Sequence, residues 1–373
     1  MLRRTRRVAL RRLRVSDPIE TVDVVVVGLG PAGSRAAAAA ARAGLRVVAL
    51  ERRREAGRPV QCAELVPLLL DQELPGLGAV TAQPIGRMQT FIEDAPPDET
   101  CPFPGRMLDR AAFDRHLAAE AAACGAECRF STAVLAITRE GDVLTSSGTL
   151  RPRVLIGADG PASRVGAAIG QTNHELVDAR QVGVTLPADH DATDIFLAAR
   201  YPGGYAWLFP KGGQANLGVG VDRSARGTLP ELLAALQARL TAAGRIGAPV
   251  GALTGGAIPV GGLLPAVGSL GAVQVLLAGD AAGLTHPVSG AGIAAAVQSG
   301  DRAGQAAAAW LGGHDAAPGD YADELADLFG ASLARGLRRR RALREDAAGG
   351  APSATALRRS WIAYSEYWAE DAP

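Results

Sequence analysis

Lysine is almost absent from this sequence, because Lys211 is the single lysine among 39 basic residues. Arginine and alanine are abundant, which we attribute to a GC-rich coding bias, so the arginine content alone indicates no nucleic-acid partner. The net charge of +1 conceals two basic clusters, RRTRRVALRRLR near the start and residues 338–341 near the end. Such clusters are typical of segments that meet an anionic membrane surface.

Cysteine is scarce as well, and its scarcity excludes a disulfide scaffold. Four cysteines stand at positions 62, 101, 124 and 128 of 373 residues, too few for a disulfide framework. Cys124 and Cys128 flank Gly125 at the expected end of a helix, which is a poor geometry for a metal ion, so we interpret them as small buried or partly exposed thiols. The sequence therefore predicts no metal site and a reducing, cytoplasmic location.

Long apolar runs are also missing. The sequence contains no stretch of about 18 apolar residues without charge, which argues against a transmembrane helix. The first fourteen residues lack the apolar centre of a signal peptide. They are interpreted either as a basic helix lying on a membrane or as a disordered or over-long extension. We expect a cytoplasmic protein whose membrane contact, if it has one, is peripheral and on the cytoplasmic face.

What the sequence does contain is enough apolar residues for a large core, since 48% of its residues are hydrophobic. Its first strong pattern is VDVVVVGLGPAGSRAAAAAARAGLRVVALERR. The pattern predicts a buried strand over 22–27, a glycine turn, a helix to about Ala43 and a second strand to Leu50. Gly28, Gly30 and Gly33 form G-x-G-x-x-G, and Glu51 follows the second strand. This βαβ unit is typical of a dinucleotide site, with a pyrophosphate at the helix N-terminus and an acid on the ribose.

Two distant segments separate FAD from NAD. VLIGADGPASRVG places Asp159 after an apolar strand, and VQVLLAGDAAGLTHPVSGAGI places Asp280 after another. With the first unit they resemble the FAD-binding set of the para-hydroxybenzoate hydroxylase-like flavoproteins. The resemblance implies that Asp280 meets the ribityl chain and that the turn over 287–293 offers backbone N–H groups to the flavin. The cofactor-binding residues implied by this turn and by the first glycine loop include Ala32, Pro287, Gly290, Gly292 and Ile293.

The segment RMLDRAAFDRHLAAEAAACGAECRFSTAV lies between these motifs. Asp109 is expected to cap a helix with Phe113 and Leu117 on its apolar face, followed by a strand to about Val134. The same resemblance implies that Arg110 reaches the FAD phosphate or ribose, and that a backbone group near Val134 meets the adenine. Arg110 as a solvated helix residue is the alternative.

The scarce aromatic residues, 4% of the chain, gather in YAWLFPKGGQANLGVG. Strand-like runs with turn residues between them predict an inserted antiparallel sheet over about 180–221. Tyr205, Trp207 and Phe209 then point to one face of a strand, and Pro210 is expected to end its ladder. By themselves these rings indicate a core face packed on a helix.

The whole string changes that interpretation. Tyr-x-Trp-x-Phe-Pro followed by Gly218-x-Gly220 resembles the substrate-region motif of the geranylgeranyl reductase family, and PVQCAELVP resembles its cysteine segment, which puts Cys62 and Ala63 at the flavin. The resemblance covers residues 22–312 and implies that the substrate-binding residues are Tyr205, Trp207, Phe209, Pro210, Gly218 and Gly220. We expect Cys62 to be the catalytic proton donor, with a packing thiol as the alternative. Lys211 is expected either to contact an anionic head group or to be exposed.

The resemblance implies reduction of carbon–carbon double bonds in an isoprenoid chain on a lipid, quinone or pigment precursor, by hydride transfer from reduced FAD. A single dinucleotide fingerprint implies that the electron donor, NAD(P)H, ferredoxin or a quinol, docks transiently. Two alternatives stay open: an FAD-dependent monooxygenase acting on an aromatic small molecule or a protein residue, and a membrane-associated flavin binding or electron-carrier protein.

The expected fold is α/β, with a Rossmann-like FAD-binding domain of GR2 type, an inserted antiparallel-sheet substrate domain and a short helical C-terminal segment. The predicted boundaries are 1–19 for the basic extension, 20–84, 102–170 and 255–312 for the FAD-binding domain, 85–101 and 171–254 for the substrate domain, and 313–373 for the C-terminal segment. This last segment contains an amphipathic helix and SWIAYSEYW, where large rings gather again.

Overall fold

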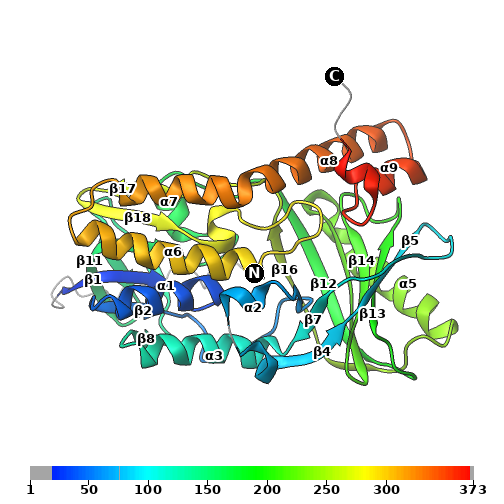
Figure 1. The fold of residues 1–373 in the computed structure, drawn as a ribbon, viewed down its shortest axis with the longest axis horizontal. Helices are drawn as coiled ribbons and strands as arrows, with labels where there is room; N and C mark the ends of the chain where they lie inside the picture. The colour runs from blue at the N-terminus through cyan, green and yellow to red at the C-terminus, as the bar shows by residue number, and fades with distance from the viewer. Residues whose placement is uncertain (1–18, 75, 370–373) are drawn as a thin grey trace, which may run out of the picture.

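The structure is a computed structural model that describes residues 19–369 except residue 75. It has two halves, which lie side by side in Figure 1, with the C-terminal helices running along one edge from the first half to the second. The predicted basic extension falls almost entirely outside the described residues. The predicted fold class is confirmed: a mixed α/β architecture with a parallel sheet, antiparallel sheets and C-terminal helices.

The first half is built on an eight-stranded sheet whose central strands are all parallel. Strand order is β17-β18-β11-β1-β2-β8, and β9 and β10 extend it as an antiparallel pair beside β11. The bounds are β1 Glu20–Val27, β2 Val47–Leu50, β8 Glu127–Arg129, β9 Val134–Ile137, β10 Val143–Thr145, β11 Gly148–Gly157, β17 Val267–Leu270 and β18 Val273–Leu277. The parallel order follows from the predicted βαβ unit, because parallel neighbours need a crossover helix.

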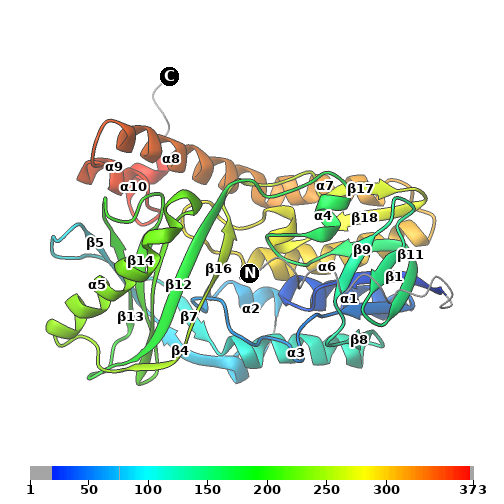
Figure 2. The ribbon, with the colours of Figure 1, turned by 180° about the vertical axis from the view of Figure 1, so that it is seen from behind.

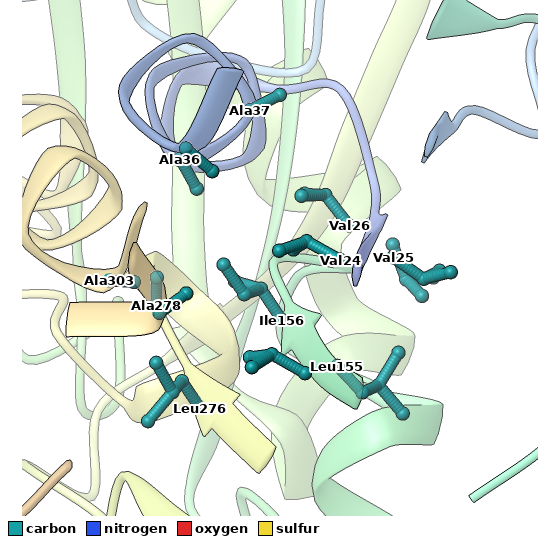
Figure 3. Close-up of a cluster of buried hydrophobic side chains, with 14 of the residues drawn as sticks. Val24, Val25, Val26, Ala36, Ala37, Leu155, Ile156, Leu276, Ala278 and Ala303 are labelled. Carbon is teal, nitrogen blue, oxygen red and sulfur yellow. The ribbon is translucent and has the colours of Figure 1, made fainter. Parts of the chain in front are cut away.

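Helices cover this sheet and close its core. The cluster in Figure 3 joins valines of β1, Leu155 and Ile156 of β11, and Leu276 of β18 to alanines of the neighbouring helices. The helices are α1 Pro31–Arg42, α3 Arg110–Ala123, α4 Arg164–Ala168 and α6 Ile293–Leu311. Glycine brings α6 against α1, since a Cβ at Gly300 would lie 2.1 Å from the carbonyl oxygen of Ala32.

The second half is a seven-stranded sheet with the order β16-β12-β15-β14-β13-β5-β6. Its bounds are β5 Arg87–Ile92, β6 Asp98–Thr100, β12 Leu176–Thr185, β13 Ala192–Leu197, β14 Tyr205–Lys211, β15 Gln214–Asp222 and β16 Pro249–Pro259. Figure 2 shows α5, Leu229–Ala242, lying against this sheet. Its leucines share a buried cluster with Leu208 of β14 and Leu217 of β15. The boundary expected after residue 254 falls inside β16, which pairs with β12 along its length.

Shorter elements join the two halves. A three-stranded sheet contains β3 Leu65–Pro67, β4 Thr81–Ile85 and β7 Gly105–Leu108. The remaining elements are α2 Leu70–Glu73, η2 Leu77–Val80, η3 Arg223–Thr228, η4 Gly279–Ala282, α7 Ala317–Leu325, η5 Ala326–Gly330, α8 Ala331–Ala348, α9 Ala354–Arg359 and α10 Ser365–Trp368. The π-helix η5 interrupts the expected amphipathic helix, and Leu328 within it is exposed.

One expectation about the ring-rich strand is wrong. Pro210 does not end the ladder, because β14 continues to Lys211 and Pro210 pairs with Ala215 of β15. On the other side, the pairing with β13 ends at Leu208. Proline has no backbone N–H to donate. It is tolerated at position 210 because β14 no longer pairs with β13 there.

Candidate active site

The glycine loop between β1 and α1 has the shape that a bound pyrophosphate requires. Gly28 adopts φ +96°, and a Cβ there would lie 2.4 Å from the carbonyl oxygen of Ala158. A Cβ at Gly33 would lie 1.7 Å from the Gly28 oxygen, so this glycine allows the helix to start close to the strand. A Cβ at Gly30 would meet no atom within 4 Å, which leaves open space in front of the α1 N-terminus.

Glu51 stands beside this loop at the end of β2. Its Oε2 accepts the backbone N–H of Leu29 at 3.1 Å, and its Oε1 accepts that of Arg53 at 2.9 Å. The carboxylate is therefore fixed next to the glycine turn, in the place where a ribose acceptor is needed. The described residues fit the adenosine and pyrophosphate parts of FAD.

A cavity of about 590 Å³ lies between the two halves of the molecule. Most of the residues expected at the flavin and the substrate meet in its wall: Gly30, Ala32, Cys62, Ala63, Arg110, Tyr205, Trp207, Phe209, Gly220, Asp280, Pro287, Gly290, Gly292 and Ile293. Seven expected residues do not line it: Gly28, Gly33, Glu51, Val134, Asp159, Pro210 and Gly218. A single space thus joins the predicted flavin turn to the ring-rich strand.

Asp159 has a structural role that its sequence context did not reveal. Its carboxylate accepts the hydroxyl of Ser163 at 2.5 Å and the backbone N–H of Arg164 at 2.6 Å, at the start of α4. Burial raises the pKa of Asp159, and these hydrogen bonds oppose the shift. The side chain therefore caps a helix beside the cavity wall.

Asp280 faces the cavity after β18. Its Oδ1 accepts the hydroxyl of Thr285 at 2.8 Å. Desolvation raises the pKa of Asp280, while Thr285 and the cation of Arg110 oppose that shift. A carboxyl group in this position can accept a hydrogen bond from a ligand hydroxyl, as expected for a group that meets the ribityl chain.

The turn before α6 is held by side chains from two other parts of the chain. The hydroxyl of Tyr205 donates to the carbonyl oxygen of Ser289 at 2.6 Å, which links the turn to β14. On the other side, Nε2 of His286 lies 3.1 Å from the hydroxyl of Tyr367. Burial lowers the pKa of His286 to about 4, so its ring is neutral at pH 7. The predicted flavin turn is therefore held in place from both sides.

The three rings of β14 form one wall of the cavity, as their spacing predicts. Centroids lie 5.7 Å apart for Tyr205 and Trp207, and 6.3 Å apart for Trp207 and Phe209. Burial, with the Cys62 thiol as the second cause, raises the pKa of Tyr205, so its phenol stays protonated. Gly220, opposite Tyr205 on β15, also lines the cavity and adds no side chain to it.

The C-terminal segment contributes residues that the sequence reasoning did not place in the site. Trp361 is 2% exposed, and its ring lies 4.9 Å from that of Tyr205. Trp361 and Ile362 line the cavity with Met88, Phe103 and Ile195, which were also missed. The clustering of large rings in SWIAYSEYW was the available signal, since the other ring cluster of the sequence, on β14, lines the cavity.

Residues 61–64 line the cavity and are attached to the second sheet. Gln61 donates to the carbonyl oxygen of Gly255 at 2.6 Å. Gln181 donates to the carbonyl oxygen of Cys62 at 2.8 Å, and Asn216 to that of Ala63 at 3.2 Å. These bonds fix the backbone on both sides of the Cys62 thiol.

Arg110 lines the cavity but is already paired. Its Nε and Nη2 donate to the two carboxylate oxygens of Asp114 at 3.0 and 3.1 Å. Burial alone would lower the pKa of Arg110, but the Asp114 carboxylate and the nearby Cys62 thiol hold that pKa above its ordinary value. The cation is therefore fixed near both Cys62 and Asp280, and it is not a solvated helix residue.

Lys211 corrects one expectation. Its Nζ lies 2.9 and 3.0 Å from the two carboxylate oxygens of Glu64, so it is not the exposed, unpaired loop lysine that was one of the two expectations. Among the described residues, no group of three or more His, Cys, Asp or Glu side chains is placed to hold a metal ion.

Comparison with known proteins identifies the family. Residues 177–245 match the geranylgeranyl reductase catalytic domain, and residues 23–96 match the FAD-dependent oxidoreductases. A digeranylgeranylglycerophospholipid reductase from Methanocella arvoryzae is 36% identical over 83% of this chain and 84% of its own length. The chain belongs to the geranylgeranyl reductase family. It is an FAD-dependent oxidoreductase, and the function expected from the sequence, reduction of double bonds in an isoprenoid chain, is confirmed at the level of this family.

Solved structures agree with this assignment. A geranylgeranyl bacteriochlorophyll reductase-like protein from Thermoplasma acidophilum has a TM-score of 0.77 and 27% identity, covering 88% of each chain. PqsL from Pseudomonas aeruginosa, solved with 2-aminobenzoylacetate, has a TM-score of 0.68 and 21% identity over 88% of this chain and 96% of its own. The second likeness shows a shared fold alone, so the monooxygenase alternative is the less supported one.

Proposed function

We propose that this geranylgeranyl reductase family member saturates the geranylgeranyl chains of a glycerolipid, and that the chain lies in the cavity between the flavin turn and the rings of β14. The observation that carries the proposal is the continuity of that cavity, whose wall contains both Gly290 of the turn and Trp207 of the ring wall. The relatives named for a digeranylgeranylglycerophospholipid support this substrate class. Quinones and pigment precursors with the same chain are the neighbouring alternatives.

The residues of the cavity have two roles in the proposed reaction: some orient the chain and exclude water, and Cys62 donates a proton. When bound, FAD in its reduced form supplies the hydride that is added to one alkene carbon. The apolar wall of Trp207, Phe209 and Met88 orients the chain and excludes water, which an unpolarised alkene requires because no carbonyl group assists the addition. Cys62, whose thiol lines the same cavity, provides the proton for the other carbon.

We further propose that the substrate enters from a membrane. Burial of a methylene is worth roughly 0.8 kcal/mol, so a twenty-carbon chain would gain on the order of 10 kcal/mol by leaving water, and such a lipid is scarcely free in solution. The described residues contain no helix that could cross a bilayer. Leu68 is 40% and Leu69 is 70% exposed, and both follow Pro67, which lines the cavity. This exposed apolar pair supports peripheral contact beside the cavity.

The electron donor is proposed to be an external partner, NAD(P)H or ferredoxin, that reduces the bound FAD and leaves. The sequence contains a single G-x-G-x-x-G loop, and the cavity behind that loop is shared with the substrate wall. A donor that docks transiently needs neither a second dinucleotide loop nor a separate permanent cavity. Comparing the rates of flavin reduction by NADH, NADPH and reduced ferredoxin would identify it.

The experiment that tests the function is anaerobic. The FAD-loaded protein is reduced with dithionite, mixed with digeranylgeranylglycerophospholipid in detergent, and followed by flavin absorbance and product mass. We expect reoxidation of the flavin with a gain of two hydrogens per double bond. Activity that requires oxygen and adds an oxygen atom to a product would instead establish the monooxygenase reaction.

A cysteine variant tests the proton donor separately. In Cys62→Ser we expect the rate of alkene reduction to fall by about 100-fold or more, the usual contribution of general acid catalysis. Cys101→Ser is the control, because Cys101 is exposed and does not line the cavity. An unchanged rate in Cys62→Ser would remove the thiol from the mechanism.

A further inference from the structure

An ion pair between the buried carboxylate of Glu64 and the partly exposed ammonium of Lys211 joins the two halves of the molecule next to Cys62. Glu64 is 3% exposed, and both of its carboxylate oxygens are used. Oε1 accepts the Lys211 ammonium at 2.9 Å and the backbone N–H of Arg110 at 3.0 Å. Oε2 accepts Lys211 at 3.0 Å and Nδ2 of Asn216 at 2.8 Å. The carboxylate therefore ties the start of α3 to strands β14 and β15 of the substrate sheet.

The backbone of Glu64 is held in an unusual conformation. Its φ is +74°, in the left-handed region that side chains other than glycine rarely adopt. In this conformation its N–H donates to Sγ of Cys62 at 3.2 Å, and its carbonyl oxygen accepts the N–H of Leu108 at 2.9 Å. A strained residue of this kind persists where the surroundings fix it, and here the fixed feature is the turn that presents the thiol to the cavity.

We propose that Glu64 and Lys211 are a positioning pair for Cys62, in which the carboxylate fixes the thiol's turn and the ammonium cancels the carboxylate's charge. The proposal rests on the proton-donor role proposed above. When the alkene takes up the proton, the S–H bond of Cys62 breaks, a C–H bond forms, and the electron pair of the S–H bond stays on sulfur. The hydride on the other carbon comes from the reduced flavin, so two hydrogens are added in total.

Electrostatics explains why the pair has to be complete. A buried carboxylate without a counter-ion would oppose the negative charge that develops on the Cys62 sulfur. The Glu64 N–H and the Arg110 cation also act on that sulfur, and both stabilise negative charge there. The pair thus supplies a rigid anchor for the turn without adding charge beside the reacting group.

The choice of lysine fits this geometry. Lys211 is the single lysine of a chain that otherwise uses arginine for every cation. Its compact ammonium lies 2.9 and 3.0 Å from the two oxygens of one carboxylate, at the end of β14.

The test measures the reactivity of Cys62 without any substrate. In FAD-loaded, oxidised protein carrying C101S, C124S and C128S, Cys62 is the only thiol. Its alkylation by iodoacetamide is followed by mass spectrometry between pH 6 and pH 9. We expect K211M to slow alkylation about tenfold at pH 7.5, because the thiolate then meets an uncompensated negative charge. We expect E64Q to accelerate it, because the cation is then unpaired, and E64Q/K211M to return toward the wild-type rate.

The opposite signs distinguish positioning by charge from loss of structure. A pair that only stabilises the fold would change the alkylation rate in the same direction in both single variants, and that result overturns the proposal. Should K211M fail to fold, E64Q against E64Q/K211M makes the same comparison, and equal rates in these two also overturn it. Arg245→Met is the matched control: it removes a cation from Asp194, a fully buried carboxylate of the same sheet, and should leave the alkylation rate unchanged.

Activity measurements then connect the pair to catalysis. We expect K211M to lower kcat for alkene reduction about tenfold with little change in KM, and E64Q/K211M to recover most of it. A protein that reduces no isoprenoid at all contradicts the proposed function, while its alkylation profile still decides whether Glu64 and Lys211 position Cys62. The two hypotheses can therefore fail independently.

Discussion

The indole of Trp207 fills the space that a side chain at Gly218 would need. The two residues are direct partners across strands β14 and β15, and a Cβ at Gly218 would lie 2.1 Å from Cζ2 of the indole. The glycine therefore lets the largest ring of the wall lie flat on the neighbouring strand. This explains why a glycine stands opposite the ring in a sheet interior, where it otherwise weakens the strand.

A side chain at position 218 should displace the ring. We expect Gly218→Val to destabilise the protein by about 1–3 kcal/mol, as overpacking usually does, and to reduce turnover of isoprenoid substrate. Chemical denaturation measures the first effect and anaerobic flavin reoxidation the second. Gly213→Ala is the control, because a Cβ at that turn glycine meets no atom within 4 Å. Normal turnover in Gly218→Val would show that the indole does not form the chain's wall.

Trp361 should limit the space available to the substrate. Its ring covers Tyr205 and lines the cavity, so Trp361→Ala would lengthen the cavity and lose about 3–5 kcal/mol of stability. We expect a higher KM for the native chain and a shift of activity toward longer prenyl chains, measured with C15, C20 and C25 substrates. Trp368→Ala is the matched control, since Trp368 is 55% exposed. An unaltered chain-length preference would contradict this role.

Stability should fall in mild acid because of His286. Its Nδ1 accepts the backbone N–H of Ser289 at 3.2 Å, which requires a neutral ring, and burial lowers its pKa to about 4. The unfolded chain binds this proton near pH 6.5, so the stability is fully present above that pH and is lost as the pH falls toward 4. Between pH 7 and pH 5, protonation of this one histidine in the unfolded chain lowers the free energy of unfolding by roughly 2 kcal/mol.

His286→Gln tests this assignment. The glutamine variant should start with lower stability at pH 7, and its free energy of unfolding should decline less than that of the wild type between pH 7 and pH 5. Urea unfolding at a series of pH values measures both quantities. Parallel declines in the two proteins would assign the acid sensitivity to other groups.

Leu68 and Leu69 should contribute to membrane contact. Replacing both with serine removes exposed apolar surface beside the cavity and should weaken binding to phospholipid vesicles by about tenfold, while leaving folding unchanged. Vesicle co-sedimentation measures the affinity, and Leu253→Ser is the control because Leu253 is 52% exposed on a different element, β16. Equal loss in both variants would indicate general hydrophobicity rather than a defined contact.

The local patterns of the sequence were sufficient for the cofactor half of the molecule. The glycine loop, the strand before it and the helix after it depend on residues within about 30 positions of one another, and the structure has β1, α1 and β2 where they were expected. The aspartate cap at Asp109 and the one-sided ring stripe of β14 are likewise local. The resemblance to the family extended the prediction from the cofactor to the class of substrate.

The partners of charged and aromatic side chains depended on the tertiary structure. Lys211 and Glu64 lie 147 residues apart in the chain, and Tyr205 and Ser289 lie 84 apart, so no periodicity relates them. Trp361 reaches the cavity only because α8 carries the C-terminal segment across to the second sheet (Figure 1). Sequence thus determined which elements form and which face of each is apolar, because those follow from local backbone geometry. Only the packing of the two halves decided which side chains meet, since that is set by the fit of whole surfaces.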